Sequence, residues 1–441
     1  MKRYSAYKDS GIEWIGEIPE GWGVKRLKYL LKSVESGSRE SQEQEFNDVD
    51  KIPSIGGEHI SWSGNIEFTD NKFVSKKYFL RLKKGKIKTG DVLLVKDGAT
   101  IGKTAFVKNE INAAINEHVF ILRTNNNFKD GLLYYNLVSD FTQDLINLFS
   151  RGAAQAGLPS DFVSNIFLLI PPEPEQTAIA TFLDHKTAKI DELIKKNEGL
   201  IELLKEKRQA IISHAVTKGL DPNAKMKDSG IEWLGEIREG WGVKKLKYVA
   251  EIVLGKMLQN EDSGKDELKP YMRAQNIQWE IVDITDVKEM WFSDYEIKKY
   301  RVQKGDLLIS EGGEVGRTAL WNGELEECYI QNSVHKVTVD KKLANNRYLL
   351  NLLKTYGKWG YFESIVNRVS IGHLTREKLK EIKIVCPPKN EQEQIVTYLD
   401  KKSSSMDEII QKIQPQIEKL KEYRQALISN VVTGKVRVDE S

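Results

Sequence analysis

Cysteine is nearly absent from the sequence: Cys328 and Cys386 are the only two in 441 residues. Two cysteines are too few for a disulfide framework and give no metal-ligand spacing, which favours a reducing cytoplasm. The most apolar stretch, Ile166 to Ile170, is far shorter than the roughly 20 residues of a membrane span, and the polar first ten residues do not resemble a signal peptide. Charge of one sign is also lacking, because 67 Lys and Arg oppose 64 Asp and Glu. A net charge of +3 permits nucleic-acid binding without arguing for it.

In place of these features the sequence contains a repeat of about half its length. Residues 8–30 and 227–249 agree at 19 of 23 positions, at an offset of 219. Two further pairs follow in the same order, 90–105 with 305–319 and 171–184 with 387–400, and residues 204–217 agree with 420–433 at ten of 14 positions. This repeat is far longer than a solenoid repeat, so two copies of a whole domain are predicted.

The middles of the two copies do not repeat. Residues 31–89 and 250–304 show no convincing similarity, although both are flanked by repeated segments. A scaffold that carries two different recognition surfaces would have this pattern. Ordinary divergence after duplication is the alternative, and it would have to spare both ends while erasing most of the middle.

The residues before each long helix indicate a mixed α/β domain. Short apolar runs after Gly-Asp, at 92–95 and 307–309, predict strands that are followed by glycine-rich turns. The continuous apolar run at 119–122 predicts a buried strand. Residues 132–149 and 348–365 are expected to be helical.

A long helix is predicted after each Pro-Pro pair, at Pro171 and Pro387, where Glu and Gln open the helical pattern. Beyond it one heptad register fits both copies and places these residues on a seam: Ile190, Ile194, Asn197, Ile201, Leu204 and Ile211, with Met406, Ile410, Ile413, Ile417, Leu420 and Leu427. Matching seams in one chain favour a pseudo-two-fold, antiparallel coiled coil, and packing of each stripe on its own domain is the alternative. Residues 190–216 would span roughly 40 Å, close to one turn of B-DNA. Pro415 is expected to kink or restart the second helix.

No catalytic site is predicted. The segment from Gly98 to Thr104 resembles a phosphate-binding P-loop, but it has three residues between its glycines where that loop needs four. The second copy repeats the short spacing, so a glycine turn between strands is the better interpretation, with Lys103 and Arg317 free to meet DNA phosphates. The sequence contains no methyltransferase tetrapeptide of the Asn-Pro-Pro-aromatic type, no dinucleotide-binding glycine loop, no metal spacing among its six histidines and no assignable catalytic triad.

Candidate DNA contacts are polar residues near the glycine turns and the proline breaks, since Arg, Lys, Asn and Gln read base edges while Lys and Arg hold phosphates. Each of them alone is also compatible with an ordinary surface residue. The candidates are Lys103, Asn116, His118, Arg151 and Gln155 in the first copy, and Arg317, Gln331, Asn332, Arg368 and His373 in the second.

These motifs together resemble the specificity (S) subunit of type I restriction-modification enzymes. The resemblance rests on Gly21-Trp22 and Gly240-Trp241, on the Gly-Asp strands with their Gly-x-x-x-Gly-Lys/Arg turns, and on Pro-Pro…Glu-Gln followed by a long Arg-Gln-Ala helix. It implies a first target-recognition domain at 1–170, a central helical spacer at 171–220, a second target-recognition domain at 221–386 and a C-terminal helical spacer at 387–441. The two spacers would form the coiled coil that sets the gap between two half-sites.

The same resemblance implies a non-catalytic, cytoplasmic subunit that reads a bipartite, asymmetric DNA site. It would bind two modification (M) subunits, which use S-adenosylmethionine to methylate adenine, and restriction (R) subunits would join to cleave DNA. No cofactor is expected in this chain. A coiled-coil scaffold that ignores DNA is the main alternative, and a nucleotide-dependent enzyme is a weaker one.

Overall fold

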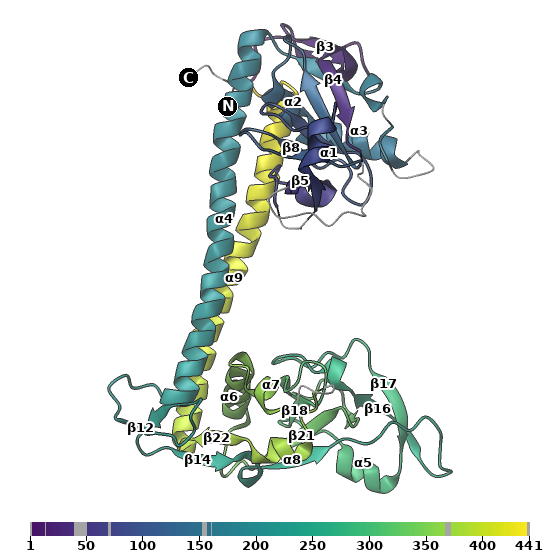
Figure 1. The fold of residues 1–441 in the computed structure, drawn as a ribbon. Coiled ribbons are helices and arrows are strands. Elements are labelled where there is room, and N and C mark those ends of the chain that lie inside the picture. Colours follow the sequence, from purple (N-terminus) through teal and green to yellow (C-terminus); the bar gives the residue numbers. More distant parts are fainter. Residues whose placement is uncertain are drawn as a thin grey trace. The chain divides into compact units, whose positions relative to one another are not determined.

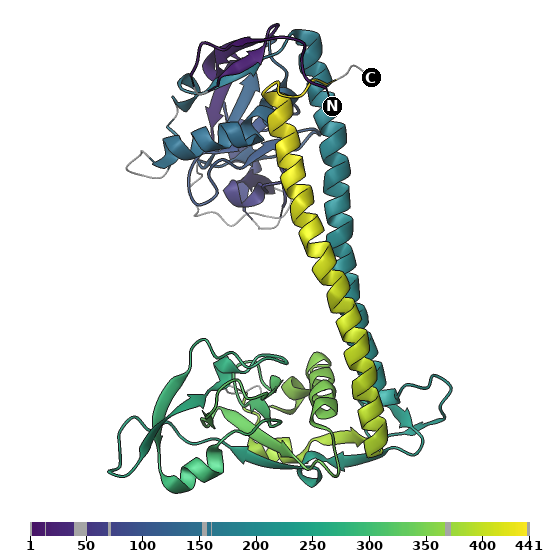
Figure 2. The ribbon, with the colours of Figure 1, turned by 180° about the vertical axis from the view of Figure 1, so that it is seen from behind.

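The computed structural model describes residues 2–13, 15–38, 51–68, 72–151, 157–159, 161–366 and 372–438, with the backbone alone for Arg151. The chain forms two compact units, residues 1–199 with 413–441 and residues 200–412. Two long helices, α4 (Glu173–Lys218) and α9 (Lys389–Val432), each contribute one part to each unit. Within each unit these parts of α4 and α9 lie side by side (Figure 1 and Figure 2).

The first unit is built on a four-stranded antiparallel sheet in the order β4-β10-β7-β8. Its strands are β4 (Leu31–Ser36), β7 (Val92–Val95), β8 (Thr104–Phe106) and β10 (Val119–Thr124). A second sheet places β5 (Lys51–Ile55) antiparallel to β6 (Phe73–Ser75) and parallel to β9 (Ala114–Ile115). Two strand pairs complete the sheets, β3 (Gly23–Arg26) with β11 (Phe167–Ile170) and β1 (Tyr7–Asp9) with β2 (Glu17–Pro19). The short helices are α1 (Lys76–Arg81), α2 (Asp130–Val138) and α3 (Asp140–Arg151), with 3₁₀ turns η1 (Leu27–Tyr29), η3 (Gly57–His59) and η4 (Phe162–Ser164).

The second unit repeats every one of these sheets with the same strand order and the same pairing directions. Its main sheet is β15-β21-β18-β19, from β15 (Ala250–Leu254), β18 (Leu307–Ser310), β19 (Thr318–Leu320) and β21 (Val334–Val339). The second sheet pairs β16 (Glu267–Met272) with β17 (Lys288–Phe292) and, in parallel, with β20 (Tyr329–Ile330). The two-stranded pairs are β14 (Gly242–Lys245) with β22 (Lys383–Cys386) and β12 (Met226–Asp228) with β13 (Glu236–Arg238). The helices are α5 (Asp294–Tyr300), α6 (Asn346–Lys358), α7 (Tyr361–Ile365) and α8 (Arg376–Glu381), with turns η5 (Leu246–Tyr248) and η6 (Ala274–Asn276). The dissimilar middles of the two copies therefore have one topology.

The main sheet of the first unit is buried on both faces. Val92 and Leu94 belong to one core cluster, whereas Leu93 and Val95 belong to another on the opposite face, as the period-2 alternation of a strand requires. All residues from Val119 to Leu122 are likewise buried. The predicted buried strand at 119–122 and the predicted strands at 92–95 and 307–309 are confirmed.

The repeated ends of each copy meet in space. In the first unit β3 pairs with β11, and the Trp22 indole Nε1 donates to Glu175 Oε2 at the start of α4 over 3.0 Å. In the second unit β14 pairs with β22, and the Trp241 indole donates to Glu391 at the start of α9 over 2.9 Å. The opening motif and the Glu-Gln helix start thus contact each other in both units, which explains why they repeat together.

The predicted helical segments at 132–149 and 348–365 are confirmed, although each is interrupted. Residues 132–149 are divided between α2 and α3, because Ser139 adopts an extended backbone between them. Residues 348–365 are likewise divided between α6 and α7, where Gly360 adopts a left-handed φ of 71°. One prediction needs correction: Pro415 does not restart the second long helix, which continues through it. The proline is exposed, and Ile413 and Ile417 beside it are buried.

The observed helices are shorter than the predicted spacers. α4 and α9 begin two residues after the expected starts, and α4 ends two residues before the expected end. α9 stops at Val432, and residues 433–438 after it are not helical. In the first unit, the tail residue Arg437 donates its N–H to the Lys2 carbonyl over 2.8 Å. All twelve predicted seam residues are buried or half-buried, whereas Leu193, Leu200 and Ile409, each next to a seam residue in the sequence, are 49%, 43% and 42% exposed.

Candidate nucleic-acid interface

Five segments of the first unit meet at one edge of its main sheet. They are residues 36–37 at the end of β4, 56–59 after β5, 96–103 between β7 and β8, 116–118 between β9 and β10, and 157–158; we call this set the first loop edge. Backbone hydrogen bonds join them: the Lys96 N–H donates to the His118 carbonyl over 3.0 Å, and the Asn116 N–H donates to the Ile55 carbonyl over 2.9 Å. The antiparallel pairing of β10 with β4 and β7 dictates this meeting, because the ends of β4 and β7 lie beside the start of β10.

The corresponding segments of the second unit form a second loop edge. It consists of residues 255–256, 273–276, 311–317, 331–333 and 372–374. The Glu311 N–H donates to the Ser333 carbonyl over 2.9 Å, and the Gln331 N–H donates to the Met272 carbonyl over 3.0 Å. Loops that present polar side chains from a rigid sheet are common recognition surfaces.

A glycine is required where two strands of each edge come together. A Cβ on Gly37 would lie 2.2 Å from the Ile115 carbonyl oxygen, and one on Gly255 would lie 2.3 Å from the Gln331 carbonyl oxygen. Both oxygens belong to backbone, so a side chain could be accepted only if the strands moved apart. Gly37 and Gly255 occupy equivalent positions within otherwise dissimilar middles.

Different residues close the 3₁₀ turn of each edge. In the first unit the buried His59 accepts the Gly56 N–H through Nδ1 over 3.0 Å. In the second unit Asn276 Oδ1 accepts the Arg273 N–H over 3.1 Å. The same backbone turn is thus held by unlike side chains, which helps to explain why the two middles share a fold without sequence similarity.

The candidate contacts of the first copy that the structure describes lie together on the first loop edge. Lys103 is half-buried and makes no side-chain hydrogen bond or ion pair within the described part of the chain. Asn116 Oδ1 accepts the His118 N–H over 2.9 Å. The His118 ring contacts Asp97 Oδ1 over 2.5 Å through Nδ1, and its Nε2 lies 3.4 Å from Glu117 Oε1. The side chain of Arg151 and all of Gln155 lie outside the described residues.

The second copy places its candidates on the second loop edge, but Arg317 is not free as expected. Its guanidinium donates to Gln278 Oε1 over 3.1 Å and to the Ala274 carbonyl over 3.0 Å, so it braces η6 from within the unit. Gln331 accepts a hydrogen bond from Ser333, while the neighbouring Asn332 is half-buried. His373 is exposed. Arg368 lies outside the described residues.

The glycine segment of each edge is a turn between antiparallel strands, as predicted. β7 pairs with β8 from Val92↔Phe106 to Leu94↔Thr104, and Gly98 and Gly102 adopt left-handed φ values of 81° and 89°. A P-loop connects a strand to a helix, whose N-terminus faces the phosphates. This loop instead returns into a strand and lacks that feature.

Comparison with known proteins identifies the family. The family model for the type I restriction modification DNA specificity domain matches residues 19–203 and again residues 238–419. The chain belongs to this family. It is 26% identical over 437 residues to the putative type I restriction enzyme MjaX specificity subunit of Methanocaldococcus jannaschii, covering 96% of each protein. It is 22% identical to the EcoKI specificity subunit of Escherichia coli K12, covering 96% of this chain and 90% of that one.

Solved structures of the type I restriction-modification family share this fold. A chain from a structure that describes complex assembly and conformational transition of the type I R-M system aligns with a TM-score of 0.69 at 20% identity, covering 95% of this chain and 99% of that one. The crystal structure of the HsdS subunit from Thermoanaerobacter tengcongensis aligns with a TM-score of 0.54 at 19% identity, covering 95% and 98%.

The specificity family was predicted from motifs that resemble it, whereas two charged residues of the loop edges were not among the candidate contacts. Lys96 and Glu311 each directly follow a buried strand, β7 and β18, at the point where the other loops converge. The signal was present in the sequence: the repeated Gly-Asp strands align these positions, and they carry opposite charges.

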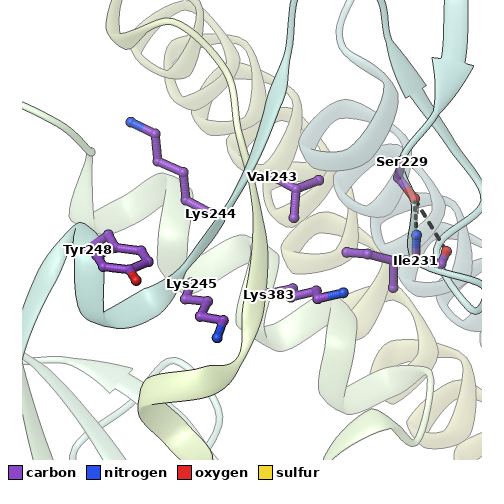
Figure 3. A pocket seen from close by; sticks show the side chains of 7 residues that line it. All are labelled: Ser229, Ile231, Val243, Lys244, Lys245, Tyr248 and Lys383. Carbon is purple, nitrogen blue, oxygen red and sulfur yellow. Dashed lines mark hydrogen bonds between the residues drawn. The ribbon is translucent and has the colours of Figure 1, made fainter.

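A basic pocket lies elsewhere in the second unit, between the opening motif and the pair β14–β22. It has a volume of about 600 Å³ and is lined by Ser229, Ile231, Val243, Lys244, Lys245, Tyr248 and Lys383. Figure 3 shows that its three lysine side chains point in different directions, so they do not converge on one anion. The Lys245 Nζ also forms an ion pair with Glu381 Oε2 over 2.5 Å.

Two other kinds of site are absent from the described residues. No group of three or more His, Cys, Asp or Glu residues there could hold a metal ion. Every helix that the structure describes falls short of the length or the hydropathy that a membrane-spanning helix needs. Both cysteines are free, and burial raises the pKa of the Cys328 thiol to about 12, which keeps it protonated.

Proposed function

We propose that this chain is the DNA-specificity subunit of a type I restriction-modification complex and that each unit reads one half of a bipartite site through its loop edge. One observation carries the proposal. Each unit has the same set of sheets with the same strand order, yet the side chains on the two loop edges differ in charge and hydrogen-bonding character. Identical scaffolds with unlike surfaces suit two half-sites of different sequence. Membership of the specificity family supports the same role.

The two long helices form, in this proposal, an antiparallel coiled coil with pseudo-two-fold symmetry that sets the gap between the half-sites. Equivalent ion pairs within the two units support it. Asp191 of α4 pairs with Arg424 of α9 over 2.8 Å in the first unit, and Arg208 of α4 pairs with Asp407 of α9 over 3.1 Å in the second. A step of 17 residues forward along α4 matches a step of 17 residues back along α9, which is the register of antiparallel helices.

The chemistry belongs, on this proposal, to partner chains. Two M subunits with S-adenosylmethionine would methylate adenine, and R subunits would add DNA cleavage, while this chain contributes recognition and positioning without catalysis. The names of the relatives support such partners, because they are specificity subunits of type I restriction enzymes.

The proposal is tested by expressing the chain with its M subunits and mapping adenine methylation across the host genome. A split, asymmetric motif is expected. Competition in gel shifts with DNA of the motif and of scrambled sequence gives a second readout, for which we expect a preference of at least about 10³-fold. Equal affinity for all sequences together with random or absent methylation would contradict the proposal and favour a scaffold that ignores DNA.

A further inference from the structure

The residues that follow β7 and β18 occupy the same place on the two loop edges. The Lys96 N–H donates to the His118 carbonyl over 3.0 Å, and its carbonyl accepts the Leu158 N–H over 2.6 Å. The equivalent Glu311 N–H donates to the Ser333 carbonyl over 2.9 Å, and its carbonyl accepts from Leu374 over 2.8 Å. Both backbones are therefore fixed in the same way between the same two neighbouring loops.

The side chains at these positions have opposite hydrogen-bonding character. The Lys96 ammonium can only donate; it reaches Ser36 Oγ over 3.1 Å and lies 5.1 Å from the centroid of the Phe120 ring. An ionised Glu311 can only accept. It is half-buried and has no side-chain hydrogen bond or ion pair within the described residues, although His373 is close enough to act on it electrostatically. Partial burial raises the pKa of the Glu311 carboxyl above its usual value.

On a surface that binds DNA, a carboxylate that meets no hydrogen-bond donor makes the free energy of binding less favourable. It repels the DNA backbone, and its desolvation on binding is compensated only if a donor meets it. The donors that DNA offers at base edges are exocyclic amino groups, and Glu accepts from cytosine N4 in the major groove. Lysine has the complementary preference for guanine O6 and N7.

We propose that Lys96 and Glu311 are equivalent base-reading residues, with Lys96 donating to a guanine in one half-site and Glu311 accepting from a cytosine in the other. This inference rests on the proposed function and adds the base class that each unit reads. Each residue would then select a G·C pair in its own half-site, Lys96 through the guanine and Glu311 through the cytosine.

The test uses the full chain in complex with its M subunits and a DNA library randomised in both half-sites. For Glu311→Gln we expect base discrimination at one position of one half-site to decrease by roughly 5- to 100-fold, with the other half-site unchanged. Glu311→Lys is expected to move the preference at that position from cytosine to guanine. Lys96→Gln is expected to relax one position of the opposite half-site.

Glu239→Gln is the matched control, because Glu239 is exposed in the turn after β13, away from the loop edge, and loses the same charge. It should leave every base preference unchanged. Unaltered preferences in both Glu311 variants and in Lys96→Gln would overturn the inference, as would a uniform loss of affinity for all sequences. If a Glu311 variant binds no DNA at all, the inference is judged by Lys96→Gln, which must relax one position of its half-site for the inference to hold. A wild-type complex without any sequence preference would instead contradict the proposed function itself.

Discussion

The two ion pairs between α4 and α9 are equivalent by sequence but should differ in energy. Arg424 donates to both oxygens of Asp191, over 2.8 and 3.3 Å, and its side chain is 12% exposed. Arg208 reaches Asp407 with a single bond of 3.1 Å, and its side chain is 31% exposed. The Arg208 Nε is also buried without a hydrogen-bond partner in the described part of the chain, which costs free energy.

We therefore expect a coupling free energy of about 1–2 kcal/mol for the pair in the first unit and of roughly 0–0.5 kcal/mol for the pair in the second. The first value stays below that of a fully buried pair, because the Asp191 side chain is 41% exposed and keeps much of its hydration. Arg→Met and Asp→Asn substitutions in double-mutant cycles isolate each coupling. Native-state hydrogen exchange measures the stability of each unit separately. Equal couplings, or a larger one for Arg208 and Asp407, would refute the reasoning from burial and geometry.

Three further outcomes follow from single residues. Burial lowers the pKa of His335 to about 4, so the unfolded chain binds more protons than the folded chain between about pH 6.5 and 4. The free energy of unfolding of the second unit should therefore fall by up to roughly 3 kcal/mol as the pH drops through that window. His335→Phe should remove this contribution in acid titrations. Gly255→Ala should destabilise the second unit by about 1–3 kcal/mol in urea unfolding, whereas Gly242→Ala, where a Cβ meets no atom within 4 Å, should change stability little. Lys103→Gln should weaken binding to all DNA sequences and reduce the slope of log K against log salt by about one, while Lys383→Gln in the basic pocket should not change that slope.

The repeat predicted the architecture because the repeated segments contact each other in the folded chain. The opening tryptophans and the glutamates that start α4 and α9 lie about 150 residues apart in the chain, yet they hydrogen-bond in both units. Such pairs must be kept together, so their presence in both copies indicates a shared tertiary contact.

Sequence similarity could not predict that the two middles share a fold. What they share is a strand pattern and a few backbone requirements, such as the glycine at Gly37 and Gly255, and not residue identity. His59 and Asn276 close the same turn with different atoms, which no comparison of residue types would reveal. Physical equivalence of this kind becomes visible only when the hydrogen bonds are known.

The candidate contacts that the structure describes lie together on the two loop edges, but their individual roles could not be read from the sequence. Arg317 aligns with Lys103, and both follow a glycine turn. Only the three-dimensional contacts show that Arg317 is held by Gln278 and Ala274, whereas Lys103 has no such partner among the described residues. Which side chain is available for a ligand depends on its neighbours in space.

The central claim is that each unit reads its own half-site, and one exchange tests it directly. Residues 31–170 are replaced by residues 250–386, so that both units carry the recognition surface of the second, and the hybrid is expressed with its M subunits for methylation mapping. The account predicts that the asymmetric motif becomes an inverted repeat of the second half-site. Methylation of the original asymmetric motif by the hybrid would contradict it.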